Sequence, residues 1–544
     1  MADHPAWARR KPDGAADSNE TSTFAAYADR LMIPELEEAI SRYDLDGAWI
    51  DGECWATHLD YCDAAVRGFR EATGLAAPKD SAQPGWQQWK EFNRAQFRKY
   101  VRKYLDAIHS YRPQFQIASN WAYTTFMPER PELPVDYLSG DFLGNASIAT
   151  ARLDARYLAQ MGKAWDLMAW GFNQGSKDGP GFVHKPAVQI EQEAAVVLAQ
   201  GGGFQVYHVP TRAGKIDPRH IAVMASVGEF CRARKPWCRG TEIVPQAGVL
   251  FSTRSLYNAP GPALFGGWGA AVNPALGVLD AVIENHIPAD VIPEWKLDEV
   301  GAEYPTLVVP DWKDLDPAAA ATLVRFATAG ARLVVIGAQN CALFEEPLGV
   351  RRNGAPKHQD AFLPGREVFG NVSGEWQTVT LNGAQPAGYF YPTFDSSRDE
   401  QIAATTCPLG KGLIAGFYGP LGEVFARTQA AAVREVFGAL LRRIFEPAVT
   451  LDGPPTVELV LRKKDSHRLV HLLNATAMQV ASEYATTDFV PTVGPMKLTL
   501  RLARQPRRVS LEPDGAVLNG AFENGVWTGL VPKLEIYSTV VFEA

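Results

Sequence analysis

Apolar residues in the first 220 positions fall into two kinds of stretch. Four stretches show the spacing of an amphipathic helix, namely residues 21–43, 87–110, 149–161 and 188–198. Five short apolar runs are typical of buried strands, namely residues 48–51, 115–119, 135–138, 165–172 and 204–209. We expect each strand to follow a helix. Such alternation indicates a parallel sheet, and this spacing is typical of a (β/α) barrel.

The pattern changes near Asp217. Residues 221–448 still alternate strands with helices, as in the apolar run at 306–310 and the helix that starts at Asp316-Pro317, which is typical of a doubly wound α/β sheet. Residues 449–544 alternate apolar and polar positions between turn signals such as Asn524-Gly525. This alternation predicts a C-terminal antiparallel β-sandwich. We therefore expect three domains: 1–220, 221–448 and 449–544.

The first of these domains is short for a barrel. A closed (β/α) barrel contains eight strands, whereas residues 1–220 supply about five. We therefore expect a (β/α) barrel that is incomplete at its N-terminal side, with the other strands encoded upstream or supplied by a partner, or else an open sheet.

Polar and aromatic side chains follow every strand expected in residues 1–220. They are Asp51 and Glu53, Asn120 and Trp121, Asp141, Trp170 and Asn173, and Tyr207 and His208. The carboxyl ends of parallel barrel strands meet at one face, where barrel enzymes hold their active sites. We therefore take these residues, together with Trp55 beside Glu53, as the candidate site.

Each candidate also has a structural interpretation. Asp51 precedes a glycine, and Asp-Gly is common in turns and helix caps. Trp121 and Trp170 offer flat faces to a sugar ring, but isolated tryptophans pack into protein cores more often. His208 suits two roles equally well: a residue that binds sugar hydroxyls, and a hydrogen-bonded histidine in the core.

Two acidic residues are set aside. Glu191 and Glu193 lie two positions apart on an expected helix and so point to different faces. We expect both to be solvated charges on the helix surface.

Composition excludes several classes of partner and cofactor. The net charge of −8 over 544 residues disfavours nucleic acid and anionic membranes, and a neutral, hydroxyl-rich ligand is compatible with it. The six cysteines are scattered without a CxxC pair, which predicts neither a disulfide framework nor structural zinc. We expect no metal, no cofactor and reduced thiols, as in a cytoplasmic protein.

Residues 43–52, YDLDGAWIDG, resemble the YxxDGxWFDG strand of α-L-fucosidases of glycoside hydrolase families 29 and 151. In those enzymes the aspartate of WFDG is the nucleophile, which corresponds to Asp51 here, and Ile50 replaces the usual phenylalanine. Residues 165–172 and 201–204 are similar to barrel strands of related glycoside hydrolases. Residues 307–311 and 329–334 resemble the glutamine-amidotransferase-like trimerisation domain of family 42 β-galactosidases.

The resemblance implies a retaining exo-glycosidase that removes a terminal sugar from a small glycan or glycoside. It also implies a homo-oligomer that assembles through residues 221–448. A retaining enzyme needs a second carboxyl group as acid and then base. Glu53 and Asp141 are the candidates, and the motif does not choose between them.

Cys341 lies in the part that resembles amidotransferases, which use a catalytic cysteine. It lacks a tight glycine elbow on both sides and an obvious histidine partner. We therefore expect residues 221–448 to be non-catalytic and to serve assembly.

Two other functions stay open. The first is a non-catalytic carbohydrate-binding or assembly protein with an incomplete barrel. The second is a β-galactosidase-like hydrolase, which we rank lower because family 42 uses glutamates on other strands and no Asn-Glu pair ends a strand here.

Overall fold

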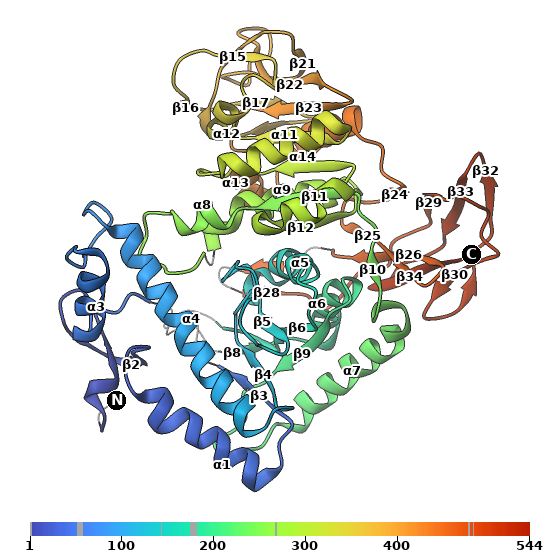
Figure 1. Cartoon of the computed structure of the whole chain (residues 1–544). Coiled ribbons are helices and arrows are strands. Elements are labelled where there is room, and N and C mark those ends of the chain that lie inside the picture. Colours follow the sequence, from blue (N-terminus) through green and yellow to red (C-terminus); the bar gives the residue numbers. More distant parts are fainter. Residues whose placement is uncertain are drawn as a thin grey trace. The chain divides into compact units, whose positions relative to one another are not determined.

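The computed structural model of the chain describes residues 3–51, 58–142, 144–174, 182–266, 269–476, 479–481 and 484–544 (Figure 1). The chain divides into two compact units. Unit 1 comprises Met1–Gly140, Met161–Trp165 and Thr253–Ala271, and unit 2 comprises Asp141–Gln160, Asp166–Ser252 and Val272–Ala544. Across the described ranges, no helix combines the length and apolar character that crossing a membrane requires.

The described residues of unit 1 form four α-helices, namely α1 (Ile33–Tyr43), α3 (Asp63–Thr73), α4 (Trp86–Tyr111) and the short α8 (Thr253–Tyr257). Pro34 lies where a π-helix, Ala28–Met32, passes directly into α1. Asp44 ends this helix in a left-handed conformation with φ 48°. Trp89 and Tyr104 on α4 are fully buried, so this long helix covers the core. The helix expected at 87–110 is confirmed. The helix expected at 21–43 is shorter than predicted, because Thr21 ends a strand and a π-helix, Ala28–Met32, leads into α1.

Strands β3 (Gly47–Ile50) and β4 (Gln116–Ser119) pair in parallel, with Ile50 opposite Ser119. A Cβ at position 47 would lie 2.6 Å from the Gln116 carbonyl oxygen, so glycine is required at the start of β3. The pairing continues past both strands, because the Asn120 N–H donates to the Ile50 carbonyl over 3.0 Å. The two strands expected here are present and parallel.

The third expected strand differs from its prediction. β5 (Leu138–Asp141) begins at residue 138 instead of 135, so Asp141 belongs to the strand instead of following it. Residues 120–137 reach β5 without a helix, although all of them are described. Pro128, Pro131 and Pro134 account for this, because proline disfavours helical backbone at its own position and at the preceding residue. The hairpin formed by β1 (Ala8–Arg10) and β2 (Ala16–Thr21) was not predicted either.

In unit 2, β6 (Trp165–Trp170) pairs in parallel with β9 (Gly203–Tyr207), with Trp170 opposite Tyr207. The order of this small sheet is β5-β6-β9. The helices around these strands are α5 (Ser147–Leu158), α6 (Ala187–Ala199) and α7 (Pro218–Cys238). An antiparallel hairpin, β7 (Phe172–Gln174) and β8 (Phe182–His184), lies between β6 and α6 in the chain and was not expected.

A seven-stranded sheet forms the middle of unit 2. Its order is β12 (Ala289–Pro293), β11 (Ala247–Phe251), β13 (Thr306–Val309), β14 (Arg332–Ile336), β23 (Gly412–Phe417), β22 (Gln401–Leu409) and β21 (Gln385–Phe390). The first five strands pair in parallel, and β22 pairs antiparallel with its neighbours β23 and β21. The parallel strands read as continuous apolar runs because helices cover parallel sheets on both faces. The helices that follow or separate them include α9 (Asn273–Ile283), α11 (Pro317–Ala329), α13 (Leu421–Thr428) and α14 (Ala431–Ile444).

Unit 2 also contains two larger antiparallel sheets, next to several two-stranded ones. The first has the order β10 (Glu242–Ile243), β25 (Val457–Lys464), β26 (His467–Asn474), β34 (Tyr537–Glu543), β30 (Arg508–Glu512) and β31 (Ala516–Val517). The second has the order β24 (Val449–Asp452), β29 (Met496–Arg501), β33 (Val526–Val531) and β32 (Gly520–Glu523). Asn524 and Gly525 both have positive φ, as a two-residue hairpin turn requires. The antiparallel C-terminal region is therefore confirmed.

The buried charge at Glu193 contradicts its prediction. Instead of lying on a solvated helix face, Glu193 is fully buried and pairs over 2.8 Å with Lys185, which is buried as well. Burial raises the pKa of Glu193, and the nearby lysine acts in the opposite direction. Helical spacing alone failed here because most of α6 is buried, so it has no extended solvent face. Glu191 is partly exposed and accepts a hydrogen bond from Ser226 over 3.0 Å.

Cys341 is fully buried in α12 (Ala338–Leu343). Burial raises the pKa of its thiol. A covered, protonated thiol is a poor nucleophile.

Candidate functional site

In unit 1, Asp51 and Asn120 lie together at the carboxyl ends of β3 and β4. Asp51 is exposed directly after β3, and its Oδ1 accepts a hydrogen bond from Asn120 Nδ2 over 3.0 Å. Asn120 is only 3% exposed, so its side chain has little freedom to turn away. Parallel pairing brings the two residues together, and the buried amide then orients the exposed carboxylate.

The segment after Asn120 has an uncommon backbone. Trp121 and Tyr123 adopt positive φ values of 69° and 64°, which bulky residues rarely do. Tertiary hydrogen bonds hold them there: the Trp121 N–H donates to the Ser139 carbonyl over 3.1 Å, and the Tyr123 hydroxyl accepts the Leu133 N–H over 3.1 Å. Such strain persists where the surroundings enforce it and is frequent at functional sites. Trp121 itself is 7% exposed, so it offers little open face for a sugar.

In unit 2, Asp141 and Trp170 are joined by a hydrogen bond. The Trp170 indole Nε1 donates to Asp141 Oδ2 over 2.9 Å, and Asp141 is 7% exposed. The Trp170 ring also lies 6.3 Å, centroid to centroid, from the ring of Tyr207. Tyr207 is 39% exposed, so it supplies the open aromatic surface in this group.

The Asn173 side chain makes a structural hydrogen bond outside this group. It is fully buried in β7, and its amide donates over 2.7 Å to the Ala485 carbonyl in β28 (Tyr484–Thr486). Gln189 donates to the same carbonyl over 3.0 Å. These bonds give Asn173 a role in fixing β28. Glu53 and Trp55 lie outside the described residues.

His208 belongs to a histidine cluster. It follows β9, while His184 ends β8 and His220 lies in the first turn of α7. A Cβ at position 171 would lie 2.4 Å from the His208 ring, so the imidazole packs directly on Gly171 and excludes any larger residue. Burial and the neighbouring histidines lower the pKa of His208. Burial and His220 also lower the pKa of His184, with a backbone hydrogen bond at Gly171 opposing them.

Sequence reasoning did not find His184 and His220. They stand 24 and 12 residues from His208 (208 − 184 and 220 − 208), which matches no local ligand motif. Only the unexpected hairpin and the start of α7 bring them together. A search for cysteine and histidine spacing therefore has no signal to detect here.

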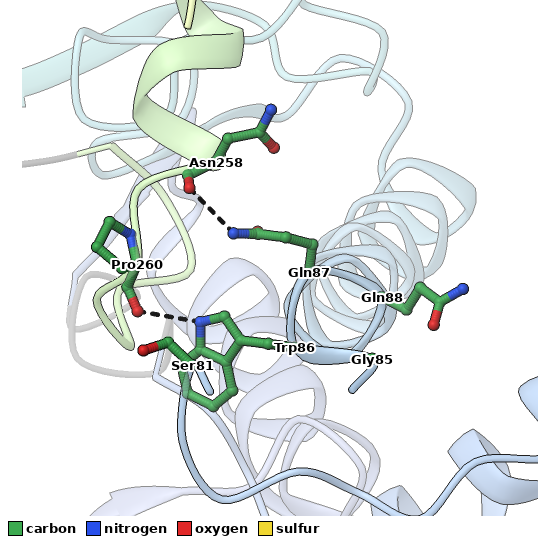
Figure 2. Close-up of a pocket in the computed structure, with 7 residues that line it drawn as sticks. All are labelled: Ser81, Gly85, Trp86, Gln87, Gln88, Asn258 and Pro260. Atoms are coloured by element: carbon green, nitrogen blue, oxygen red, sulfur yellow. Dashed lines mark hydrogen bonds between the residues drawn. The ribbon is translucent and has the colours of Figure 1, made fainter. Parts of the chain in front are cut away.

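A separate cavity of about 390 Å³ lies in unit 1 at the start of α4 (Figure 2). It is lined by Ser81, Gly85, Trp86, Gln87, Gln88, Asn258 and Pro260. The Trp86 indole donates to the Pro260 carbonyl over 3.1 Å, and Gln87 donates to the Asn258 carbonyl over 3.0 Å. None of the candidate residues lines this cavity, and it offers no ionisable group, so we assign it no chemistry.

The chain shares its fold with solved structures of an α-L-fucosidase and of β-galactosidases, which superpose on it over its whole length. No protein-family model and no curated protein matches it by sequence. The α-L-fucosidase isoenzyme 2 from Paenibacillus thiaminolyticus superposes with a TM-score of 0.84 at 18% identity and covers 100% of this chain and 85% of that chain.

Two β-galactosidases superpose more loosely. A GH42 β-galactosidase from G. stearothermophilus gives a TM-score of 0.69 at 13% identity, covering 100% of this chain and 86% of that chain. A β-galactosidase from Bacillus circulans sp. alkalophilus gives 0.69 at 13% identity, covering 99% and 86%. At such identities the likeness shows the fold alone. The resemblance to fucosidases and family 42 β-galactosidases is confirmed at that level.

Proposed function

We propose that the protein is a glycoside hydrolase of the α-L-fucosidase kind, an exo-acting retaining enzyme with Asp51 as its nucleophile. The observation that carries the proposal is the exposed Asp51 carboxylate at the end of β3, held by the buried Asn120 amide over 3.0 Å. Support comes from the family-like sequence around Asp51 and from the fold shared with a solved α-L-fucosidase.

The proposed reaction has two steps. The Asp51 carboxylate attacks the anomeric carbon while a second carboxyl group protonates the leaving oxygen, and water then hydrolyses the glycosyl-enzyme with that second group acting as base. Asn120 keeps one carboxylate oxygen occupied and so directs the other towards the sugar. Tyr207, which is 39% exposed, is proposed to bind the sugar ring.

We further propose the architecture that this function needs. β3, β4, β5, β6 and β9 are assigned as strands of a (β/α) barrel in residues 1–220. Residues 221–448 are assigned as a glutamine-amidotransferase-like domain that assembles a homo-oligomer, and residues 449–544 as a β-sandwich. The fold shared with GH42 β-galactosidases supports this assignment.

A panel of 4-nitrophenyl glycosides tests the proposed function. We expect release of nitrophenol from the α-L-fucoside at a rate well above that from the other sugars. Fastest turnover of the β-D-galactoside would favour the second candidate, which the superposition on β-galactosidases supports. Sugar binding by calorimetry without turnover of any glycoside would contradict both hydrolase proposals and favour a binding protein.

The acid/base is assigned by comparing Glu53→Ala with Asp141→Ala. Loss of the acid/base is expected to slow hydrolysis of a substrate with a poor leaving group by about 10²-fold or more. The same variant should still cleave an activated aryl glycoside, because a good leaving group departs without protonation, and azide should trap the sugar with retained configuration. The other variant should treat both substrates alike. Similar slowing of both substrates in both variants would remove Glu53 and Asp141 from this role.

A further inference from the structure

Three histidines of unit 2 face one another where β8 ends, β9 ends and α7 begins. One ring nitrogen from each of His184, His208 and His220 lies within 4.8 Å of those of the other two. The ring centroids of His184 and His220 are 4.0 Å apart, and those of His208 and His220 are 5.0 Å apart. Three imidazoles from three separate elements thus converge on one point.

His208 supplies an independent sign that this point takes a ligand. His208 is only 6% exposed. Neither of its ring nitrogens has a hydrogen-bond partner among the residues that the structure describes. A buried polar atom left unpaired costs about 1 to 3 kcal/mol, so native proteins rarely retain one without a reason. A ligand bound by His208 satisfies one of these two nitrogens.

We propose that His184, His208 and His220 bind a divalent transition-metal ion of the Zn²⁺, Co²⁺ and Ni²⁺ class. Neutral imidazole nitrogen is a preferred ligand of these ions, whereas Mg²⁺ and Ca²⁺ prefer oxygen. A tetrahedral ion with bonds of about 2.0 to 2.1 Å places its ligand nitrogens about 3.4 Å apart. The partly or fully exposed His184 and His220 reach that spacing by turning about χ2, a broad torsion in histidine. Water completes the fourth position.

The surrounding chain holds the buried ligand in place. A Cβ at position 171 would lie 2.4 Å from the His208 ring, so Gly171 allows the ring to sit where the other two histidines meet it. An ion bound there ties the hairpin β7/β8 and the start of α7 to the end of β9, next to the exposed Tyr207. This inference is independent of glycosidase activity.

Metal binding to untagged, chelator-treated protein tests the proposal. We expect isothermal titration with Zn²⁺ to give one ion per chain, and Co²⁺ to give the visible absorption of a tetrahedral nitrogen site. His184→Gln and His220→Gln are each expected to weaken Zn²⁺ binding at least tenfold, and the double variant to lose it. Both residues have solvent access, so the variants should fold. His358→Gln, an exposed histidine in β16 (Lys357–Gln359), serves as the matched control and should bind as the parent does.

Thermal unfolding gives a second readout. An ion that binds only the folded state raises Tm in proportion to its affinity, so Zn²⁺ should raise the Tm of the parent and of His358→Gln by several degrees. It should leave the His184→Gln/His220→Gln double variant unchanged. Equal Zn²⁺ affinity in the double variant and the parent overturns the proposal, as does a parent protein that binds no ion.

Discussion

Replacing Asp51 with glycine is expected to slow hydrolysis of an aryl α-L-fucoside by roughly 10⁴-fold, because the variant lacks the carboxylate that forms the covalent intermediate. Glycine also leaves a space beside the anomeric carbon. Azide fits that space and attacks directly, so added azide should restore turnover. Because only one displacement then occurs, the product should be the sugar azide with inverted configuration.

Asp44→Gly is the matched control for this variant. Asp44 lies just before β3 with φ 48°, a conformation that glycine adopts readily, and its side chain is 90% exposed with an ion pair to Arg112 over 2.9 Å. An exposed pair of this kind contributes about 1 kcal/mol or less, so the control should keep full activity. Unchanged turnover in Asp51→Gly, or lost turnover that azide fails to restore, would remove Asp51 from the nucleophile role.

The fold could be predicted wherever apolar residues kept one regular spacing along a whole element. α4 and β3 have strong periodic patterns, and both lie where the sequence predicts. β5 was placed three positions early (138 against 135) because Val135 continues the apolar run, although it precedes the strand. The strand β12 was not predicted, because its short run contains Asp290. The structure buries that aspartate, and the Tyr304 hydroxyl donates to its carboxylate over 3.2 Å. Local pattern does not report which polar residues find buried partners.

The candidate site was predictable only as far as parallel pairing determines it. Asp51 meets Asn120, and Trp170 meets Asp141 and Tyr207, because the ends of paired strands are neighbours. Asn173 was predicted from the same rule, yet the chain turns there into β7 and buries its amide against β28. The positions of His184 and His220 depend on that same hairpin and on where α7 begins. Neither feature can be predicted from the spacing of residues.

Replacing Glu458 with glutamine is expected to lower the free energy of unfolding by about 3 to 5 kcal/mol, the range for breaking a buried ion pair. Glu458 lies in β25, is 1% exposed, and accepts from Arg152 over 2.9 Å and from Arg156 of the same helix, α5. Arg152 also pairs with Asp280 of α9 over 3.1 Å. Without the Glu458 charge, Arg152 keeps its pair with Asp280, whereas the buried Arg156 loses the carboxylate with which it pairs.

The pKa of Glu458 determines in which direction the stability changes with pH. Burial pushes the pKa of Glu458 upward, but Arg156 and Arg152 outweigh it, and the pKa lies below its usual value. The stabilisation is therefore complete above pH 4.5 and is lost as the pH falls through the lowered pKa of the folded state. Glu458→Gln should remove that loss, because the variant has no carboxylate there to protonate.

Denaturant unfolding of Glu458→Gln, compared with Glu446→Gln, measures the effect. Glu446 pairs with Arg501 over 2.7 Å, but the two side chains are 78% and 54% exposed, so solvent screens the pair and its loss should cost about 1 kcal/mol or less. Both substitutions remove one carboxylate, which pairs with two buried arginines at Glu458 and with one largely exposed arginine at Glu446. If both variants lose the same small amount, the α5, α9 and β25 contacts do not depend on the Glu458 charge, and apolar packing alone joins these elements.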